Sequence, residues 1–246
     1  MSRIAVFFHC LFYRDNELLL NACDIVDEQM TALRESGLLH DCSEFIVGIN
    51  GGKESEDMAN LLIPSKAKKI MHGLASKSEN LTIVEIEKWL PSHRGWHVLY
   101  FHSKGATSVG SEQERRKQWR LCMMNNLVLK WHRCTRDLNH GFDSVGCHWI
   151  SNFMKPLFDH QNQRDQAYWA GNFWWATSDF LLSLPSIHNR ARIHWSGIGS
   201  IESRYEAEVW IGNGSRIPKV KDYHPENPTL PLACQAQAYL PVGSMV

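Results

Sequence analysis

The chain has 246 residues, of which 43% are hydrophobic and 21% are charged, values that are ordinary for a soluble globular protein. Lysine and arginine together number 26, as do aspartate and glutamate, so the formal net charge is zero at pH 7. A neutral chain without a basic stripe argues against nucleic-acid binding and against a general attraction to membranes, so any anion site must be local.

The composition also bears on the compartment of the protein. No apolar run approaches the roughly 20 residues that a membrane span needs, and no cleavage signal follows the short apolar run at the N-terminus. The seven cysteines are scattered without a Cys-x-x-Cys pair, which favours reduced core thiols over disulfides or zinc. We therefore expect a cytoplasmic protein with no membrane span.

The N-terminal part of the chain predicts a parallel βαβ unit. Residues 3–8 form a β-branched and aromatic run, which indicates a buried strand ending at His9 and Cys10. A long amphipathic helical pattern follows, and residues 45–49 predict a second strand that ends on Asn50. A strand, a long helix and a strand of these lengths predict that the sheet begins parallel.

The next stretch predicts two helices and a third strand. Residues 54–62 and 65–75 have helical patterns and are separated by Pro64. Residues 81–86 are apolar and β-branched, which predicts a strand, and a turn or short helix is expected after it.

A fourth strand is expected at residues 96–101, and it ends on three polar side chains. These are His102, Ser103 and Lys104. Ligands of open α/β sheets bind outside the carboxyl ends of the strands, so an imidazole, a hydroxyl and an ammonium group there indicate an anion site. The alternative is that His102 only caps the strand and that Lys104 is solvated.

The second half of the chain mixes expected helices and strands. Helical patterns cover residues 111–138, 179–184 and 204–211, strand patterns cover 147–150 and 168–176, and an exposed loop is expected at 159–168. After Pro218 the sequence is rich in proline, glutamine and small residues, which predicts a tail.

Five short motifs stand out between residues 3 and 212. They are Tyr100-Phe-His-Ser-Lys-Gly105, Trp119-Arg120, Gly141-Phe-Asp-Ser-Val-Gly146, Gly171-Asn-Phe-Trp-Trp-Ala176 and Glu208-Val-Trp210. Together they resemble a family of small soluble glycosyltransferases of bacteria, phages and large DNA viruses. The resemblance implies an α/β, Rossmann-like GT-A fold, with a parallel N-terminal βαβ half and a mixed-sheet C-terminal half.

The same resemblance implies a domain organisation and an activity. One domain is expected over residues 1–217, with a donor half at about 1–105, an acceptor half at about 106–217, and a wrapping tail over 218–246. The implied activity is transfer of a sugar from a nucleoside-diphosphate donor, with a UDP-sugar favoured, to a glycan or another hydroxyl acceptor. The alternative is a non-catalytic carbohydrate-binding or scaffolding protein that retains the fold.

One departure from the family pattern concerns the metal. Many GT-A enzymes carry Asp-x-Asp at the end of the central strand, where the carboxylates hold a divalent metal against the diphosphate. This chain has His102, Ser103 and Lys104 there. Either Lys104 replaces the metal as a positive point charge, or His102 and a carboxylate such as Asp143 or Glu208 bind Mn or Mg. We favour the first.

The donor-binding residues are expected at the strand ends. The set that the base, the ribose and the diphosphate would contact is His9, Cys10, Asn50, His102, Ser103, Lys104 and Arg120, with Arg115 as an alternative to Arg120. The sugar would be oriented by the aromatic block, namely Gly171, Asn172, Trp174 and Trp175. The two tryptophans are adjacent in an expected strand, so one should face the core and the other the cleft.

The catalytic groups are expected to be Glu208, Asp143 and Lys104. A carboxylate is the natural base for an acceptor hydroxyl, and we choose Glu208 because it accompanies Trp210 in the family-like motif. Glu206 is two residues away on the same expected helix and should point elsewhere. A further carboxylate, Asp179, stands at a helix start, where it is expected to interact with the helix dipole.

Overall fold

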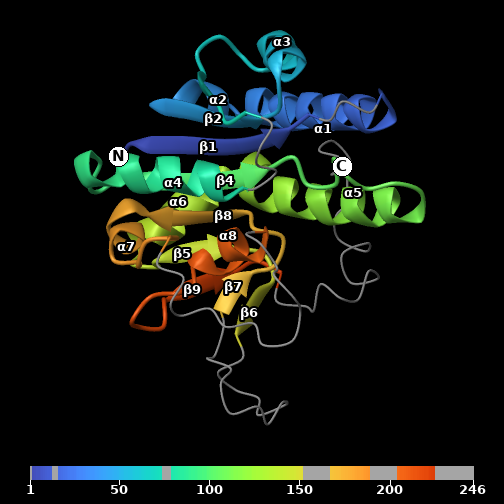
Figure 1. Ribbon diagram of the computed structural model, residues 1–246. Coiled ribbons are helices and arrows are strands. Elements are labelled where there is room, and N and C mark those ends of the chain that lie inside the picture. The colour runs from blue at the N-terminus through green and yellow to red at the C-terminus, as the bar shows by residue number, and fades with distance from the viewer. Residues whose placement is uncertain (1, 13–15, 74–78, 152–166, 189–203, 225–246) are drawn as a thin grey trace.

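The computed structural model describes residues 2–12, 16–73, 79–151, 167–188 and 204–224. Its centre is a seven-stranded sheet in the order β3-β2-β1-β4-β8-β5-β9, and most of its strands succeed one another from top to bottom in Figure 1. The strands are β1 (Ile4–Leu11), β2 (Glu44–Asn50), β3 (Lys68–Met71), β4 (His97–His102), β5 (Ser144–Gly146), β8 (Trp174–Thr177) and β9 (Val220–Asp222). A separate two-stranded sheet pairs β6 (Trp149–Ser151) with β7 (Ala167–Trp169).

The sheet is mostly parallel. Strands β3, β2, β1 and β4 pair in parallel, β8 runs antiparallel to both β4 and β5, and β9 is parallel to β5. The predicted α/β class is therefore confirmed, with a parallel N-terminal half and a mixed C-terminal half. Strand β9 joins the sheet although the tail was expected to begin at residue 218.

Helices cover both faces of this sheet. They are α1 (Asn16–Glu35), α2 (Leu38–Asp41), α3 (Lys53–Leu62), α4 (Asn80–Trp89), α5 (Ser111–Met124), α6 (Trp131–Asn139), α7 (Ser178–Leu182) and α8 (Arg204–Trp210). A 3-10 turn, η1 (Leu90–Ser92), follows α4, and a π-helical segment, η2 (Asn125–Leu129), joins α5 to α6. Within the described residues, none of these helices is both long and apolar enough to span a bilayer.

Two apolar cores lie on opposite faces of the sheet. One side of β1 packs with α1, α5, η2 and α6, and its other side packs with α4, η1, α7 and α8. Alternation along β1 produces this division, because Phe8 and Cys10 belong to the first core while Phe7 belongs to the second. Both faces of the central strands are thus buried, as their continuous apolar sequences predicted.

Two predictions in the first half were wrong. Residues 65–75 were expected to be helical, but β3 lies there and pairs with β2 in parallel. Residues 81–86 were expected to be a strand, but they belong to α4. Ile83 and Ile86 stand three residues apart and are both buried, so packing of one helical face overrides the β-branched composition.

The second half follows the predictions with local changes. The expected helix over 111–138 is present but is interrupted at η2, and the expected helices near 179–184 and 204–211 are α7 and α8. The expected strand over 168–176 is two strands, β7 and β8, with a turn between them. Gly171 and Asn172 in that turn have φ values of 92° and 54°. Most of the expected loop and tail lies outside the described residues.

Candidate active site

The carboxyl ends of the parallel strands define one edge of the sheet. His9 on β1 lies beside His102 on β4, and in Figure 1 α5 extends past this end of β1. Strand β8 runs the other way, with Trp174 beside Tyr100, so its start reaches the same edge. The topology therefore brings the Asn172 turn to the predicted ligand side of the sheet.

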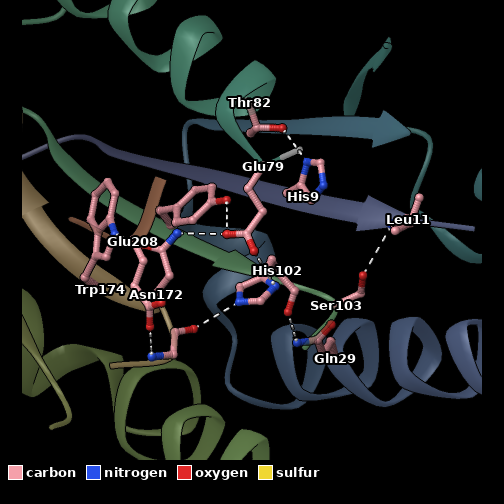
Figure 2. A network of polar contacts seen from close by, with 12 residues as sticks. His9, Leu11, Gln29, Glu79, Thr82, His102, Ser103, Asn172, Trp174 and Glu208 are labelled. Carbon is pink, nitrogen blue, oxygen red and sulfur yellow. Dashed lines mark hydrogen bonds and ion pairs between the residues drawn. The ribbon is translucent and has the colours of Figure 1, made fainter. Parts of the chain in front are cut away.

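A partly buried carboxylate that the sequence analysis missed, Glu79, lies at the centre of this edge. It immediately precedes α4, and its Oε2 accepts hydrogen bonds from Tyr100 Oη at 3.1 Å and from Asn172 Nδ2 at 2.8 Å. Its Oε1 is 3.4 Å from His102 Nδ1 (Figure 2). Burial alone would raise the pKa of Glu79, but the charge of His102 and the other polar neighbours outweigh it and lower the pKa. Glu79 is therefore held ionised.

His9 lies on the α4 side of the same edge. Its Nδ1 is 2.8 Å from Thr82 Oγ1 on α4, and burial lowers the pKa of His9 to about 3, so the ring is neutral. Gly48 on β2 makes room for this contact, because a Cβ there would stand 2.0 Å from Thr82 Oγ1. His9 thus joins α4 to the sheet beside Glu79.

Lys104 follows β4, as predicted, and it is buried rather than solvated. Only 9% of the residue is exposed, and its Nζ lies 4.0 Å from the centre of the Trp119 ring on α5. Its carbonyl oxygen accepts a hydrogen bond of 2.8 Å from Arg120 Nη1. Arg120 in turn makes a bidentate ion pair with Glu28 on α1, at 2.8 and 3.0 Å. Arg120 therefore holds the Lys104 backbone in place, and its guanidinium is engaged by protein groups.

A second cation stands beside the same indole. The Arg116 Cζ lies 5.5 Å from the Trp119 ring centre, whereas Arg115, the alternative considered from sequence, pairs with exposed Glu112. Trp119 Nε1 is buried and has no hydrogen-bond partner within the part of the chain that the structure describes. The helical spacing of α5 indicated a core residue at 119, but only the fold shows that Lys104 and Arg116 flank it.

Glu208 on α8 reaches this edge through the Gly171 turn. Its Oε1 accepts a hydrogen bond of 2.7 Å from Gly171 N, while the Gly171 carbonyl accepts one of 3.0 Å from His102 Nε2 (Figure 2). Gly171 has φ 92°, and a Cβ there would lie 2.9 Å from Met123 Sδ, so a side chain would be both strained and crowded. Glu206, by contrast, accepts a hydrogen bond from Asn80 Nδ2 at 2.8 Å.

The tryptophans of the aromatic block are not exposed to a ligand. Trp174 and Trp175 are both 0% exposed and lie in opposite cores, because β8 is covered on both faces. Their indole Nε1 atoms donate to Asn172 Oδ1 at 2.9 Å and to the Leu127 carbonyl at 2.8 Å. The expectation that one ring faces a cleft is therefore corrected, and neither ring can stack on a sugar in this arrangement.

Three donor-site candidates at the strand ends differ in accessibility. Cys10 points into the α1 core, where burial raises the pKa of its thiol far above the usual range, so its side chain is not a ligand group. Asn50 is fully buried at the end of β2. Ser103 Oγ accepts a hydrogen bond of 3.3 Å from Leu11 N and ties the end of β4 to β1.

Asp143 lies at the opposite edge of the sheet. It precedes β5, and its neighbour Ser144 pairs with Ala176, which in turn pairs with Val98 near the start of β4. Its carboxylate binds both terminal nitrogens of Arg216, at 2.6 and 2.7 Å. Asp143 and His102 therefore cannot share a metal, and the catalytic role expected for Asp143 is corrected to a structural one.

Replacing Asp143 with asparagine is expected to lower the free energy of unfolding at pH 7 by about 1 kcal/mol, since Arg216 is largely exposed. Burial raises the pKa of Asp143, but hydrogen bonds from Arg216 and from Lys219 N outweigh it and lower the pKa. A lowered folded pKa gives stability that is present above the unfolded pKa of about 4 and is lost as the pH falls through the folded value. Urea unfolding at pH 7 and pH 3 should show the difference shrinking, and an equal difference at both would contradict it.

The remaining carboxylate considered from sequence, Asp179, also has a structural role. It accepts a hydrogen bond of 3.0 Å from Gly95 N and pairs with Arg94 at 3.2 Å, at the beginning of α7.

The described residues do not fit a divalent metal. They contain no group of three or more histidine, cysteine, aspartate or glutamate side chains arranged as ligands. At the edge itself, Glu79 and Glu208 accept hydrogen bonds from protein groups, and His102 has one nitrogen toward a carbonyl and the other toward Glu79. We therefore derive no step through a metal.

Comparison with known proteins gives a family and a fold likeness. Residues 7–220 match a family model described as a domain of unknown function, DUF8361. No curated protein matches the sequence. Among solved structures, 4-diphosphocytidyl-2C-methyl-D-erythritol synthase from Anaerococcus prevotii DSM 20548 is 9% identical, with a TM-score of 0.48 and coverage of 92% of this chain and 88% of that one.

A second solved structure with a similar fold is glucosyl-3-phosphoglycerate synthase from Mycobacterium tuberculosis in complex with Mn2+, UDP and phosphoglyceric acid. It is 12% identical, with a TM-score of 0.37, and the alignment covers 75% of this chain and 58% of that one. Similarity at this level does not identify an activity, which has to be argued from the residues of this chain.

Proposed function

The chain belongs to the DUF8361 family. We propose that it transfers a sugar from a nucleoside-diphosphate donor to a hydroxyl group of a glycan or another acceptor, and that the favoured donor is a UDP-sugar. The observation that carries the proposal is the position of Lys104. Its ammonium group is buried at the carboxyl end of the central strand and lies over the Trp119 indole, and the same indole lies close to Gly171 in the turn that holds Glu208.

Lys104 and Arg116 would stabilise the leaving diphosphate. Sugar transfer breaks the bond between the anomeric carbon and the phosphate oxygen, and the electron pair leaves with the diphosphate. A cation placed in advance where this charge develops is worth more in a buried site than in water. Both cations stand over one indole, Lys104 buried and Arg116 with 27% of its side chain exposed, so a diphosphate could reach them from the Arg116 side.

Glu208 would act as the base. The acceptor oxygen forms the new bond to the anomeric carbon, and its proton passes to the Glu208 carboxylate. The hydrogen bond from Gly171 N fixes one carboxylate oxygen, which orients the group toward the edge. Gly171 also lies close to the Trp119 ring, so the turn that holds the base borders the indole beside Lys104.

The other residues expected to contact the donor keep their place in this proposal, but their side chains make fewer of the contacts. Asn50 and His9 lie at the strand ends where a base and ribose would bind, with backbone groups making the contacts, and Asn172 shapes the turn rather than touching the sugar. We further propose that the catalytic domain runs through β9, beyond the expected boundary at residue 217, because β9 completes the sheet beside β5.

The proposal is tested with purified protein and a panel of UDP-, GDP- and TDP-sugars, each with and without EDTA. We expect a thermal shift and release of the nucleoside diphosphate with at least one donor, and no loss of either in EDTA, because Lys104 takes the place of a metal. The absence of hydrolysis, transfer and thermal shift with every donor would overturn it. Binding of glycans without any nucleotide binding would favour the non-catalytic alternative.

A further inference from the structure

The polar residues at the sheet edge form one continuous chain of contacts. It runs from Glu79 to His102, through the Gly171 backbone, to Glu208 (Figure 2). These groups come from different parts of the fold, since Glu79 immediately precedes α4, His102 ends β4, Gly171 lies in the turn before β8 and Glu208 lies on α8. Neither the sequence motifs nor the proposed chemistry assigns a role to Glu79.

Two oxygen atoms lie near the ring nitrogens of His102 and bear on its protonation. The Gly171 carbonyl can only accept, so His102 Nε2 carries a proton and donates it. His102 Nδ1 lies 3.4 Å from Glu79 Oε1, an ion-pair contact for a charged ring. An imidazole with an oxygen acceptor at each nitrogen is stabilised in its doubly protonated form, and the nearby charge of ionised Glu79 favours the same form.

Glu79 also holds the Gly171 turn at a second point. Its Oε2 accepts from Asn172 Nδ2, and Asn172 Oδ1 accepts from Trp174 Nε1. Asn172 has φ 54°, a conformation that is uncommon for a residue with a side chain and that persists where the surroundings enforce it. The hydrogen bond from His102 to the Gly171 carbonyl and the one from Asn172 to Glu79 together fix the backbone of residues 171 and 172. They therefore also fix the direction of the Gly171 N–H that binds Glu208.

From these contacts we propose that Glu79 is a positioning residue for Glu208. It acts through imidazolium His102 and through Asn172, and it touches neither substrate. The inference rests on the proposed role of Glu208 as base. Without the Glu79 carboxylate, Tyr100 Oη and Asn172 Nδ2 lose their common acceptor and His102 loses its ion-pair partner. The turn then loses its direct attachment through Asn172, and the attachment through His102 loses the charge that supports it.

The test is Glu79→Gln, with Glu85→Gln as the matched control. Glu85 lies on the same helix, and its partner is Lys88 near the surface, so this variant removes the same charge away from the edge. We expect Glu79→Gln to lower kcat by about 100-fold, because misplacing a reacting group by about 1 Å has that effect. KM for the donor should change by less than about threefold, since the phosphate contacts remain. Glu79→Asp, which keeps the carboxylate, should regain part of the loss.

Two NMR signals test the same inference without substrate. In the wild type, both His102 ring nitrogens should be protonated at pH 7, and the Gly171 amide proton should be shifted downfield by its bond to Glu208. In Glu79→Gln, one ring proton should be lost and the Gly171 signal should move upfield. Unchanged signals, or an unchanged kcat, would overturn the proposal.

These readouts separate the two proposals. If no donor is turned over but both NMR signals respond to Glu79→Gln, the sugar-transfer proposal fails and the positioning contacts stand. If turnover is found and neither signal responds, the positioning role fails alone. Should Glu79→Gln not fold, the wild-type spectrum still decides, because a singly protonated His102 ring contradicts the inference.

Discussion

Replacing Lys104 with methionine is expected to lower kcat/KM for the nucleotide sugar by about 10²- to 10³-fold, the usual effect of removing one preorganised group that stabilises developing charge. Methionine keeps a long apolar stem beside Trp119 but supplies no charge, so the change isolates the ammonium group. The leaving diphosphate then meets Arg116 alone, whose side chain is the more exposed of the two. Steady-state release of the nucleoside diphosphate measures the effect, and a smaller thermal shift with UDP should accompany it.

Lys117→Met is the matched control for this prediction. Lys117 lies on α5, two residues from Trp119, and is exposed to solvent, so the variant removes the same charge outside the edge. Its kcat/KM should stay within about twofold of the wild type, as an exposed charge is screened. Equal losses in both variants would mean that the general field of α5 attracts the donor. An unaffected Lys104→Met enzyme would remove the diphosphate site from Lys104.

Lys104→Arg gives an independent reading of the same site. The charge is retained, but the guanidinium is planar and longer than the ammonium, and residue 104 is buried beside Trp119. We expect an activity between those of the wild type and Lys104→Met. The two variants together separate charge from shape as the contribution of residue 104.

The central parallel strands were predictable from sequence because both faces of the sheet are buried there. Strands β1, β2 and β4 are continuous apolar runs with a polar residue at the carboxyl end, and that pattern located His9, Asn50 and His102 correctly at one edge. The same principle explains the error at Trp174 and Trp175. Strand β8 also lies inside the sheet and is covered on both sides, so its aromatics pack into the two cores.

Glu79 could not be found from sequence because all of its partners are remote. It is 21 residues from Tyr100 and 93 from Asn172, and no periodic pattern links them. The expected strand at residues 81–86 also hid it, since a residue before a strand gives no reason to expect a carboxylate that points toward the ligand edge. Only the observed helix α4, packed across the parallel strands, directs Glu79 into the edge.

Arg120 shows that the sequence predicts the location of a residue better than it predicts its partners. The sequence placed a guanidinium near Lys104, and the structure agrees, but a bidentate pair with Glu28 occupies it. A motif gives the proximity of residues, whereas the distribution of hydrogen-bond partners depends on α1, which is remote in sequence. Arg120 is therefore important for the position of Lys104, and its own charge is neutralised by the protein.

Replacing Glu208 with glutamine is expected to lower kcat by about 10²- to 10⁴-fold, the range that a positioned general base contributes. Glutamine can still accept the hydrogen bond from Gly171 N through its side-chain oxygen, so the turn should keep its geometry while the proton acceptor is lost. KM for the donor should be nearly unchanged, because Lys104 and Arg116 are untouched. Donor hydrolysis and sugar transfer, measured separately, check the result, and transfer should fall more than hydrolysis.

Glu206→Gln is the matched control, since it makes the same change two residues away on α8. Its carboxylate accepts from Asn80 Nδ2 at the beginning of α4 and lies outside the chain of contacts that joins Glu79 to Glu208. Its kcat should remain within about threefold of the wild type, because the proposed mechanism gives Glu206 no contact that differs between ground and transition states. If Glu206→Gln loses transfer and Glu208→Gln keeps it, the base is Glu206 and the Gly171 N–H serves only to pack α8 against the turn. If both keep it, the acceptor proton leaves by a route that α8 does not supply.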